Sequence, residues 1–562
     1  MRGLVYDRTL LGNGALLLGI GLVASVFVPF ALAMAVFSLS ASLHPSFFFL
    51  GQLLGLTAII IVGRREGIEY HYLASIALLL VLMIVGAVWL ASFYYDLSWD
   101  GMSYHQEAII HLANGWNPLK QDLQESVIYS IFINNYPKAS WIYAALLFKV
   151  TGSIESGKAY HLILMLAGFL IVLAAALRIK RVPLWLGVWF ATLSAANPVI
   201  LYQSLSYYVD GPMGATLTAI AAVSLLLYLS PTKTLAALWI MLGVLAINLK
   251  FTGVPYVIVG GAGLILVAAV GRHWSLAMRS VQALMITLFF GIAIVGYNPY
   301  ISNYIDHGHP FYPIFGDPPF DFGMRYQTPK GLQDGGRVQK MLTSLLSDST
   351  NALEFTPELQ AFSLLPPRGS ITAFRTTDMR VGGWGPLFGR IVVVLGAGLL
   401  LCLLVARPLR YGGVVAGSLA IILVSVLVNP EAWWARYTPQ LWVIPVSLGL
   451  WLLLQSSKVA RYLGGVTLIL LSLNTLLVAA VYYKYNHTVN AKLHSQLTSL
   501  AKSNTIFQAD FGPFEALRER LSASGVRFSI VPTATLRCAT PQVLVGTYRG
   551  VRLCMQAPAL GR

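Results

Sequence analysis

Charged residues are scarce in this sequence. Lys, Arg, Asp and Glu together make up 11% of its 562 residues, and 57% of the residues are hydrophobic. Soluble domains carry about 25% charged residues, and the mean hydropathy here is +0.69. This composition excludes a soluble globular protein and makes the lipid bilayer the expected solvent and partner.

Acidic residues are scarcer than basic ones. The 22 Asp and Glu face 38 Lys and Arg, which gives a formal net charge of +16. A basic excess is also typical of nucleic-acid-binding proteins, but these cations lie in short connectors between apolar runs, where they set membrane orientation. No basic patch with interleaved aromatic residues occurs, so we expect no nucleic-acid partner.

Cysteine is nearly absent, and the three present do not have the spacing of a zinc site. Cys402 lies in an apolar run. Cys538 and Cys554 lie close together in the polar tail, where they would form a disulfide if the tail faces an oxidising compartment. We predict no cofactor firmly, and the sequence leaves a divalent metal open.

Long apolar runs dominate what is present, and each is long enough to be counted as a membrane-spanning helix. The first run is longer than a signal-peptide core, so we interpret it as a retained signal anchor. About thirteen spans are predicted, at residues 10–37, 45–63, 71–92, 158–177, 183–200, 213–229, 234–249, 254–271, 282–298, 390–406, 412–428, 438–454 and 462–483.

A cytoplasmic N-terminus gives a consistent orientation, because it leaves the basic short connectors in the cytoplasm. The cations placed there are Arg64, Arg65, Arg178, Lys180, Arg181, Lys233, Arg272, Arg279, Arg407, Arg410, Lys458 and Arg461. The predicted parts are an N-terminal transmembrane hairpin (1–70), a catalytic core (71–298) with an outer loop (93–157), a large extracytoplasmic loop (299–389), C-terminal transmembrane helices (390–483) and an extracytoplasmic C-terminal domain (484–562).

Three further elements are expected outside the membrane. Apolar residues at helical spacing in 105–114 predict a short amphipathic helix on the membrane surface. The run Pro137–Val150 predicts a second interfacial helix, with a re-entrant segment as the alternative. The tail predicts a small α/β domain with a helix at Phe514–Leu521 and strands at Val526–Val531 and Val543–Val551.

Asp100 is the first candidate for catalysis, because it directly follows a predicted span in the first outer loop. A carboxylate partly removed from water has a raised pKa and can act as a general base. The alternative is that Asp100 caps the helix that follows it, a common role for Asp. Asp96 is a weaker candidate that we expect to be solvated.

Further charged candidates lie at the outer ends of later spans. Asp210 is either functional or satisfies free backbone amides at a helix start. Lys250 and Arg436 either bind phosphate or extend along the span end to reach the interface.

A loop candidate follows in the segment 298–313, where Asp306, His307 and His309 either bind a metal or belong to a hydrogen-bonded loop. Its spacing is not diagnostic of a metal. The glycine-rich stretch 378–386 lacks the strand and helix of a nucleotide-binding loop.

At these residues the chain resembles the GT-C superfamily of membrane glycosyltransferases, which includes protein O-mannosyltransferases and bacterial aminoarabinose transferases. Asp100 matches the acidic residue of the family's first outer loop, and Asp210 matches an acidic residue at a later span. Lys250 follows a leucine in a Gly/Leu-rich hairpin, and Arg436-Tyr437 precedes a proline, as the family often has. The resemblance covers most of residues 71–455.

The segment Pro137–Gly152 also looks like the family's second surface helix. The chain departs from the family in having an additional pair of spans before the catalytic loop. It also lacks an adjacent Asp-x-Asp or Glu-x-Asp pair, which leaves metal dependence open.

The resemblance implies a multi-pass protein of the bacterial inner membrane with an extracytoplasmic active site. It implies transfer of a sugar, with inversion, from a polyprenyl-phosphate donor to a lipid, glycan or protein acceptor. Asp100 would be the base, supported by Asp210, and Lys250 and Arg436 would hold the lipid phosphate. The residues expected to position substrate are Tyr104, His105, His309 and Tyr437. The alternatives are a transporter or lipid-linked glycan flippase, and a noncatalytic assembly protein of the cell envelope.

Overall fold

The computed structural model describes residues 2–316, 327–357, 365–405, 412–532, 535, 536, 538 and 540–555. Within these residues, eight helices are long and apolar enough to cross a membrane. They are α1 (Arg2–Ser38), α2 (Ser46–Arg65), α3 (Tyr70–Phe93), α7 (Ala159–Arg178), α10 (Asp210–Leu229), α12 (Gly253–Val270), α13 (Trp274–Leu288) with its π-helical continuation η3 (Phe289–Ile294), and α21 (Lys458–Lys502). The chain is thus a helical protein of the kind that suits a lipid bilayer.

Shorter apolar helices fill the remaining predicted spans. They are α6 (Ala139–Thr151), α8 (Leu184–Ala195), α11 (Lys233–Leu249), α18 (Phe388–Val405), α19 (Gly412–Val428) and η7 (Pro439–Trp442), which leads into α20 (Val443–Leu453). Short polar elements complete the helical part: η1 (Gly101–His105), α4 (Gln106–Ala113), α5 (Ser130–Asn135), η2 (Ile154–Lys158), α9 (Pro198–Gln203), η4 (Tyr297–Ile301), α14 (Ser302–His307), η5 (Lys330–Leu332), α16 (Arg337–Leu346), α17 (Arg368–Thr372), η6 (Ala435–Tyr437) and α22 (Leu517–Ala523).

Helix therefore occurs at every run that we predicted as a span, but several helices are shorter than a span requires. Run 183–200 is an example, because it divides into α8 and α9. Asn197 lies between the two helices and caps the start of α9, because its side chain accepts a hydrogen bond from the Val199 amide at 2.9 Å. Pro198 is the first residue of α9. The count of thirteen crossings, and the domain boundaries drawn from it, stay a prediction.

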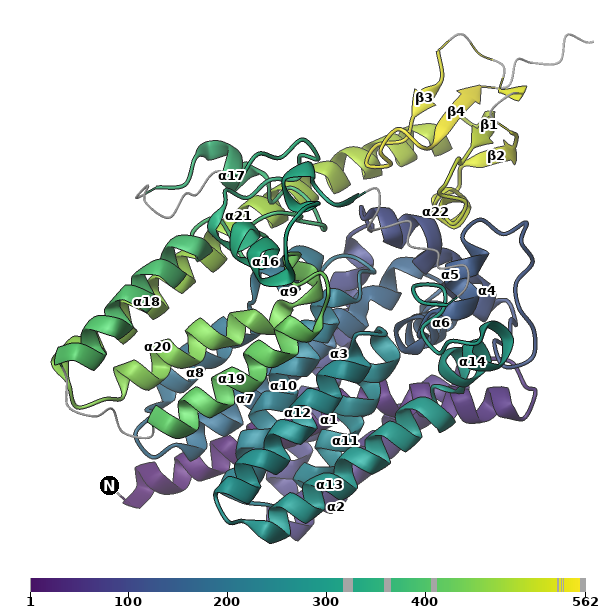
Figure 1. Cartoon of the computed structure of the whole chain (residues 1–562). Coiled ribbons are helices and arrows are strands. Elements are labelled where there is room, and N and C mark those ends of the chain that lie inside the picture. Colours follow the sequence, from purple (N-terminus) through teal and green to yellow (C-terminus); the bar gives the residue numbers. More distant parts are fainter. Residues whose placement is uncertain are drawn as a thin grey trace, which may run out of the picture.

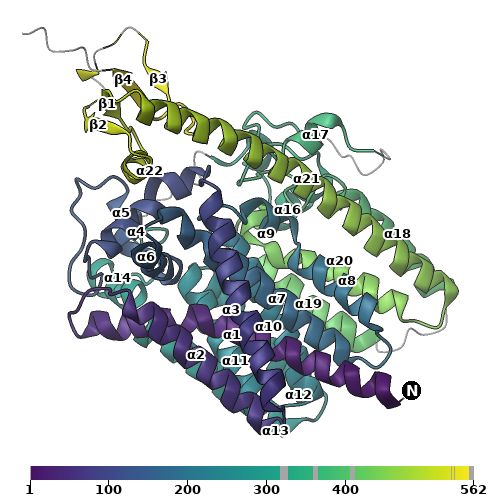
Figure 2. The same cartoon turned by 180° about the vertical axis from the view of Figure 1, so that it is seen from behind.

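The long helices form one bundle, in which α1 packs along α7 and α2, and α7 packs against α10 (Figures 1 and 2). Glycine permits the close approach of α1 to α7, since a Cβ at Gly19 would lie 2.6 Å from Ile171 Cγ1. Small residues have this role at contacts between membrane helices.

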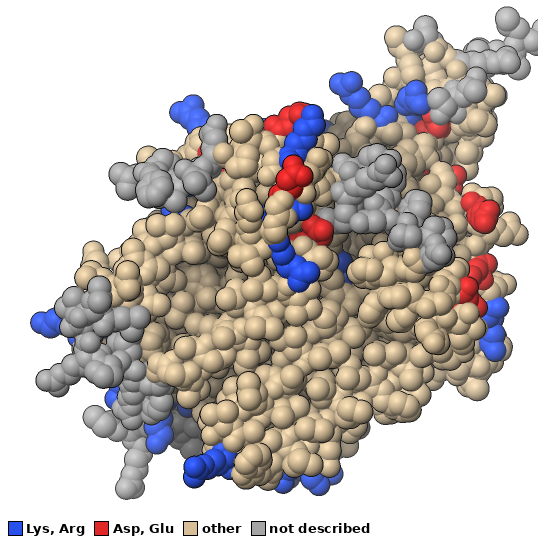
Figure 3. Space-filling model, in the orientation of Figure 1, with Lys and Arg blue, Asp and Glu red and all other residues tan. Residues whose placement is uncertain are grey.

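Charges on the bundle surface are arranged as a bilayer requires. On the face shown in Figure 3, charged side chains gather in the upper part and at the lower edge, and a broad uncharged area separates them. Those visible along the lower edge are Lys or Arg. Because such residues are retained in the cytoplasm, this edge is the one that we expect to face the cytoplasm. Arg407 and Arg410, which we also expected there, lie outside the described residues.

Helix α21 is much longer than a membrane crossing. Its 45 residues extend over about 67 Å, whereas the hydrocarbon core measures about 30 Å. The helix continues well beyond residue 483, where we predicted that the span ends. Its far end carries the small α/β domain that protrudes from the bundle in Figures 1 and 2.

The α/β domain confirms the fold predicted for the tail. Its described strands are β1 (Ile506–Asp510), β2 (Arg527–Ile530), β3 (Gln542–Val543) and β4 (Arg552–Met555), in the order β2-β1-β4-β3. β1 and β2 are parallel, and β4 is antiparallel to both neighbours. The sequence missed β1, and the predicted strand Val543–Val551 was wrong. Gly546, Tyr548 and Arg549 have positive φ, so the chain turns there and β4 begins only at Arg552.

The two predicted interfacial segments are helical, as η1 with α4 and as α6. The predicted polar face of the first was wrong, because His105 and Gln106 are buried. They lie beneath other parts of the protein, which sequence periodicity does not register.

The predicted disulfide between Cys538 and Cys554 is confirmed. Cys402 is a free, buried thiol. Denatured, non-reduced protein should therefore take up one thiol label per chain, and reduction should raise this to the three cysteines of the sequence. Mass spectrometry of the labelled protein reads both numbers, and three labels without reduction would contradict the disulfide.

The orientation can be tested with reporter fusions. Fusions after Arg65 and Arg181 should report the cytoplasm, because Lys and Arg in short connectors are retained there. Fusions after Gln121 and Ser503 should report the opposite side. A cytoplasmic signal after Ser503 would contradict the odd number of spans. Two further sites suggested by the sequence, Asp317 and Arg410, lie outside the described residues.

Candidate functional site

Asp100 does not have the capping role that the sequence left open. Within the described part of the chain, its side chain makes no cap hydrogen bond to η1. Ser98 takes that role, since its Oγ accepts from the Gly101 amide at 3.1 Å. The Ser98 amide in turn donates to Asp96 Oδ1 at 2.7 Å. The carboxylate of Asp100 is thus available for a tertiary contact.

That contact is with Arg436, which lies among three carboxylates. Arg436 Nη2 is 3.5 Å from Asp100 Oδ2, its Nε is 3.3 Å from Asp210 Oδ2, and its Nη1 is 3.2 Å from Asp378 Oδ2. The guanidinium also lies over the rings of Tyr208 and Trp434, at 4.7 and 4.8 Å from their centroids. We call Asp100, Asp210, Lys250, Asp378 and Arg436 the charged cluster.

Lys250 joins the charged cluster through Asp210. Its Nζ is 2.5 Å from Asp210 Oδ1 and 3.8 Å from the centroid of the Tyr437 ring. The free amide at the start of α10 does not need Asp210, because Gly211 N donates to Gln203 Oε1 at 2.7 Å. Gln203 Nε2 lies 3.3 Å from Asp210 Oδ2. Asp210 is therefore bound to side chains, and Lys250 is not simply extended toward an interface.

Burial sets the electrostatics of the cluster. The side chain of Asp100 is 19% exposed, and that of Arg436 is 11% exposed. Burial raises the pKa of Asp100 to about 6, although Arg436 opposes the change. Burial lowers the pKa of Lys250 to about 8, opposed by Asp210. For Arg436, burial disfavours the charged form, but Asp378 and Asp210 outweigh it and raise its pKa.

Tyr104 and His105 lie in an aromatic group beside Asp100. Their rings are 4.3 Å apart, and Trp141 Nε1 donates to His105 Nδ1 at 2.5 Å. Burial lowers the pKa of His105 to about 3, so the imidazole is neutral and carries its proton on Nε2. A neutral ring suits positioning by hydrogen bonds rather than proton transfer from an imidazolium.

Tyr437 packs against the charged cluster, but among the described residues no contact joins His309 to that cluster. The Tyr437 ring lies under Lys250, and its carbonyl oxygen accepts from the Tyr256 hydroxyl at 2.5 Å. His309 accepts from the Phe311 amide through Nδ1 at 3.1 Å and packs on Phe315. The hydrogen-bonded loop is thus the better interpretation of the segment 298–313. Among the described residues, no group of three His, Cys, Asp or Glu is arranged to hold a metal.

Sequence reasoning missed Asp378 as a site residue. Its amide donates to Thr376 Oγ1 at 3.1 Å, which orients the start of the glycine-rich stretch. The sequence did offer a signal for Asp378: it is an acidic residue that lies between Arg375 and Arg380, shortly before the predicted span 390–406.

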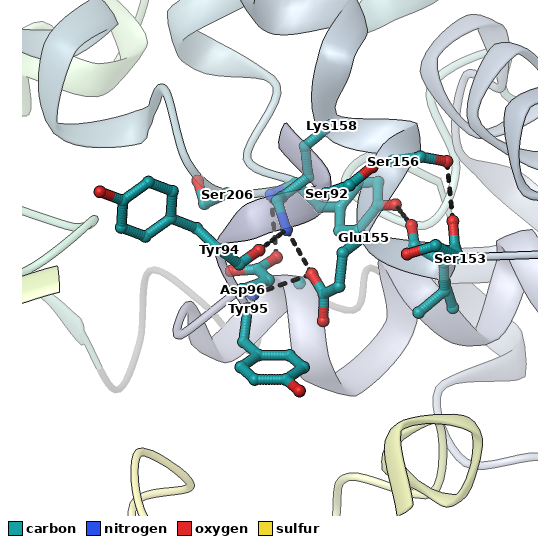
Figure 4. Close-up of polar contacts among 12 residues, drawn as sticks. Ser92, Tyr94, Tyr95, Asp96, Ser153, Glu155, Ser156, Lys158 and Ser206 are labelled. Atoms are coloured by element: carbon teal, nitrogen blue, oxygen red, sulfur yellow. Dashed lines mark hydrogen bonds and ion pairs between the residues drawn. The ribbon is translucent and has the colours of Figure 1, made fainter. Parts of the chain in front are cut away.

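A second buried group of charged residues consists of Asp96, Glu155 and Lys158 (Figure 4). The prediction that Asp96 is solvated was wrong, because Asp96 is fully buried. Its amide donates to Glu155 Oε2, and its Oδ2 accepts from the Tyr207 amide, both at 2.9 Å. Lys158 pairs with Glu155 and donates to the Tyr94 carbonyl at 2.6 Å. Burial raises the pKa of Asp96 to about 6.

The α/β domain completes this second group. Arg520 lies 2.8 Å from Glu155 Oε1 and donates to the Asp96 carbonyl at 2.9 Å. Two residues earlier on α22, Arg518 binds Glu107 with two hydrogen bonds of 2.7 and 2.8 Å. Trp99 packs edge-on against Phe514. The domain therefore holds the segment directly before Asp100 in place.

Comparison with known proteins identifies no family for the chain. No protein-family model matches the sequence, and no curated protein is significantly similar to it. The geometry of the charged cluster and the short motifs are accordingly the basis for a functional argument.

Proposed function

We propose that the protein is a membrane glycosyltransferase that uses a polyprenyl-phosphate sugar as donor. One observation carries the proposal. Four charged residues selected from the sequence, Asp100, Asp210, Lys250 and Arg436, come from distant segments and meet in one cluster with Asp378. If these four residues were only charged groups that reach toward water at helix ends, nothing would bring their side chains into contact with one another.

The cations of the cluster suit the phosphate of the donor. Arg436 offers a planar fork of N–H groups, and Lys250 offers a compact point charge, the two modes by which proteins bind phosphate. Both are partly buried, so their attraction to an anion is little weakened by water. Before donor binds, the three carboxylates balance them, which keeps the cations in place.

The proposed reaction is a single displacement. The oxygen of an acceptor hydroxyl attacks the anomeric carbon, and Asp100 takes the hydroxyl proton. The bond between the anomeric carbon and the phosphate oxygen breaks, and its electron pair leaves with the polyprenyl phosphate. Lys250 and Arg436 stabilise the charge that develops there. Attack opposite to the leaving group inverts the anomeric centre.

The position of the cluster favours an enzyme over a transporter. A transporter would be expected to carry its charges near the middle of its helices, at repeat interfaces. Asp210 is the first residue of α10, and Lys250 directly follows α11. Arg436 lies in the short helix η6. Asp210 and Lys250 thus lie at helix ends and Arg436 lies in a short connecting helix, where a lipid phosphate in the headgroup layer would reach them.

The orientation of the protein in the membrane is part of the same proposal. Nucleotide sugars are cytoplasmic, so a site facing outward needs a donor carried on a lipid. We place the protein in the bacterial inner membrane, with an N-terminus in the cytoplasm and the charged cluster outside. The acceptor is a hydroxyl of a lipid, glycan or protein.

Mass analysis of envelope glycans tests the proposal. Cells that lack the protein should lose one defined sugar mass from a glycan or glycolipid, and the wild-type chain should restore it. The chain with Asp100→Asn should be present in the membrane at the normal level without restoring it. Unchanged glycans in cells that lack the protein would contradict the function.

A further inference from the structure

A cavity lined by polar and apolar groups lies where the bundle meets the α/β domain. Its volume is about 370 Å³, in the range of sites that bind small ligands. It is enclosed by α21, the loop before Asp378, the segment before Asp100 and the turn between β3 and β4. The lining residues are Leu97, Arg375, Thr376, Thr377, Tyr482, Tyr485, Asn486, Gly546 and Tyr548.

Two buried polar groups at the cavity have no satisfactory hydrogen bond. Among the described residues, the Tyr482 hydroxyl and Asn486 Oδ1 make no hydrogen bond of good geometry, although the Tyr482 hydroxyl lies close to Asn486 and to the backbone of Leu205. Tyr482 is 0% exposed and Asn486 is 2% exposed. Leaving such groups unpaired is costly, and buried polar atoms in proteins nearly always have partners. Both residues line the cavity, where a ligand can supply a hydrogen-bond partner.

The other lining side chains indicate what kind of ligand this is. Tyr485 and Tyr548 contribute aromatic rings, and Thr376 and Thr377 contribute hydroxyls. A sugar ring has hydroxyls at its rim and C–H groups on its faces, which match hydroxyl and amide partners and aromatic faces respectively. Arg375 adds N–H donors, which serve sugar oxygens equally well.

The cavity is connected to the charged cluster on two sides. Thr377 directly precedes Asp378, and its carbonyl oxygen lies 3.3 Å from Gln203 Nε2, the group that also bonds Asp210. On the other side, Leu97 precedes Asp100 by three residues. Its carbonyl accepts from the Tyr548 hydroxyl at 3.2 Å. The cavity is thus lined by the residue directly before Asp378 and by a residue of the segment that leads to Asp100.

We infer that this cavity binds a hydroxyl-rich saccharide, which is the acceptor of the transfer. Binding of the saccharide stands on the cavity alone, whereas its role as acceptor rests on the proposed function. In that role the saccharide presents one hydroxyl to Asp100, and the Tyr482 hydroxyl and Asn486 hold its remaining oxygens. The polyprenyl donor approaches Lys250 and Arg436 from the bilayer.

Saturation-transfer NMR with the purified full-length protein tests the binding. The probes are maltotriose, cellotriose, mannotriose and triacetylchitotriose, each titrated alone. At least one should bind the wild type. Tyr482→Phe removes one hydroxyl and should weaken binding about 3- to 10-fold, the effect of one neutral hydrogen bond. Tyr485→Ala removes a ring face and should weaken it by about 10-fold or more.

Tyr462→Ala is the matched control. Tyr462 is an exposed tyrosine on the same helix and does not line the cavity, so the variant should bind as the wild type does. Tyr482→Phe should be at least as stable to heat as the wild type, because it removes an unsatisfied buried hydroxyl. If none of the four probes binds, or if both cavity variants bind them normally, the inference is overturned.

Asp100→Asn separates the two proposals. Asp100 does not line the cavity, and asparagine can still accept a hydrogen bond from the hydroxyl that the saccharide presents, so this variant should keep saccharide binding. If it does so and envelope glycans are nevertheless unchanged without the protein, the saccharide site stands and the glycosyltransferase proposal fails. If the glycans change but neither cavity variant affects saccharide binding, the glycosyltransferase proposal stands and the saccharide site fails.

Discussion

Asp100→Asn is expected to insert and fold normally and to lose about 10²- to 10⁴-fold in turnover, the usual contribution of a general base. Asparagine keeps the size of the side chain but takes no proton at neutral pH. Ser98, not Asp100, caps η1, and Arg436 keeps Asp210 and Asp378 as partners. The loss should therefore appear in turnover and not in the amount of folded protein, and both are measured on purified protein.

The pH dependence provides a second measurement on the same residue. The base acts when deprotonated, so wild-type turnover should rise with pH through about 6, the raised pKa of Asp100. A carboxyl group with a raised folded pKa stabilises the protein below its unfolded pKa of 3.8 and loses that contribution as the pH rises through about 6. Asp100→Asn should consequently be as stable as the wild type, or more so, at pH above about 6. A destabilised variant would indicate a structural role instead.

Arg436→Ala is expected to have the largest effect on stability and also to slow transfer. It leaves Asp100, Asp210 and Asp378 close together with Lys250 as the remaining cation. Removing one partner of a buried ion pair costs about 3–5 kcal/mol, because the other charge stays buried. Loss of a charge-assisted contact to the donor phosphate adds about 1.5–3 kcal/mol to the transition state.

Arg436→Lys is the matched variant. It keeps the positive charge but not the fork that reaches three carboxylates, so it should recover part of the stability and little of the transfer. The stability deficit of Arg436→Ala should be largest at neutral pH and shrink in acid, where protonation relieves the repulsion among carboxylates. Thermal unfolding of both variants at pH 5 and 7.5, set about one unit or more on each side of the pKa of about 6, measures this. An Arg436→Ala protein as stable as the wild type at neutral pH would contradict the cluster.

Much of the charged cluster was predictable because charge is so rare in this chain. In an apolar sequence, an acid or a base at the end of a span needs a reason. That argument selected Asp100, Asp210, Lys250 and Arg436 without knowledge of their contacts. Helix positions were predictable for the same reason, since long apolar runs in lipid form helices.

The rest depended on tertiary contacts between distant residues. Asp378 lies in a long loop without periodicity, and its partner Arg436 is far along the chain. The burial of Asp96 could not be predicted from the residues around it, because Arg520, which donates to its carbonyl, comes from the α/β domain far along the chain. The capping question at Asp100 was decided by Ser98, whose side chain competes for the same amide. Sequence patterns report local geometry and do not say which of several local partners is used.

The most direct test of the account is donor turnover by purified protein in lipid nanodiscs. The substrates are polyprenyl-phosphate sugars labelled in the sugar, supplied with acceptor extracted from cells that lack the protein. The wild type should release polyprenyl phosphate and attach label to an acceptor, Asp100→Asn should do neither at a comparable rate, and Tyr462→Ala should match the wild type. Equal turnover by Asp100→Asn, or transfer by neither protein from any of the donors, would contradict the assignment of the charged cluster as a glycosyl-transfer site.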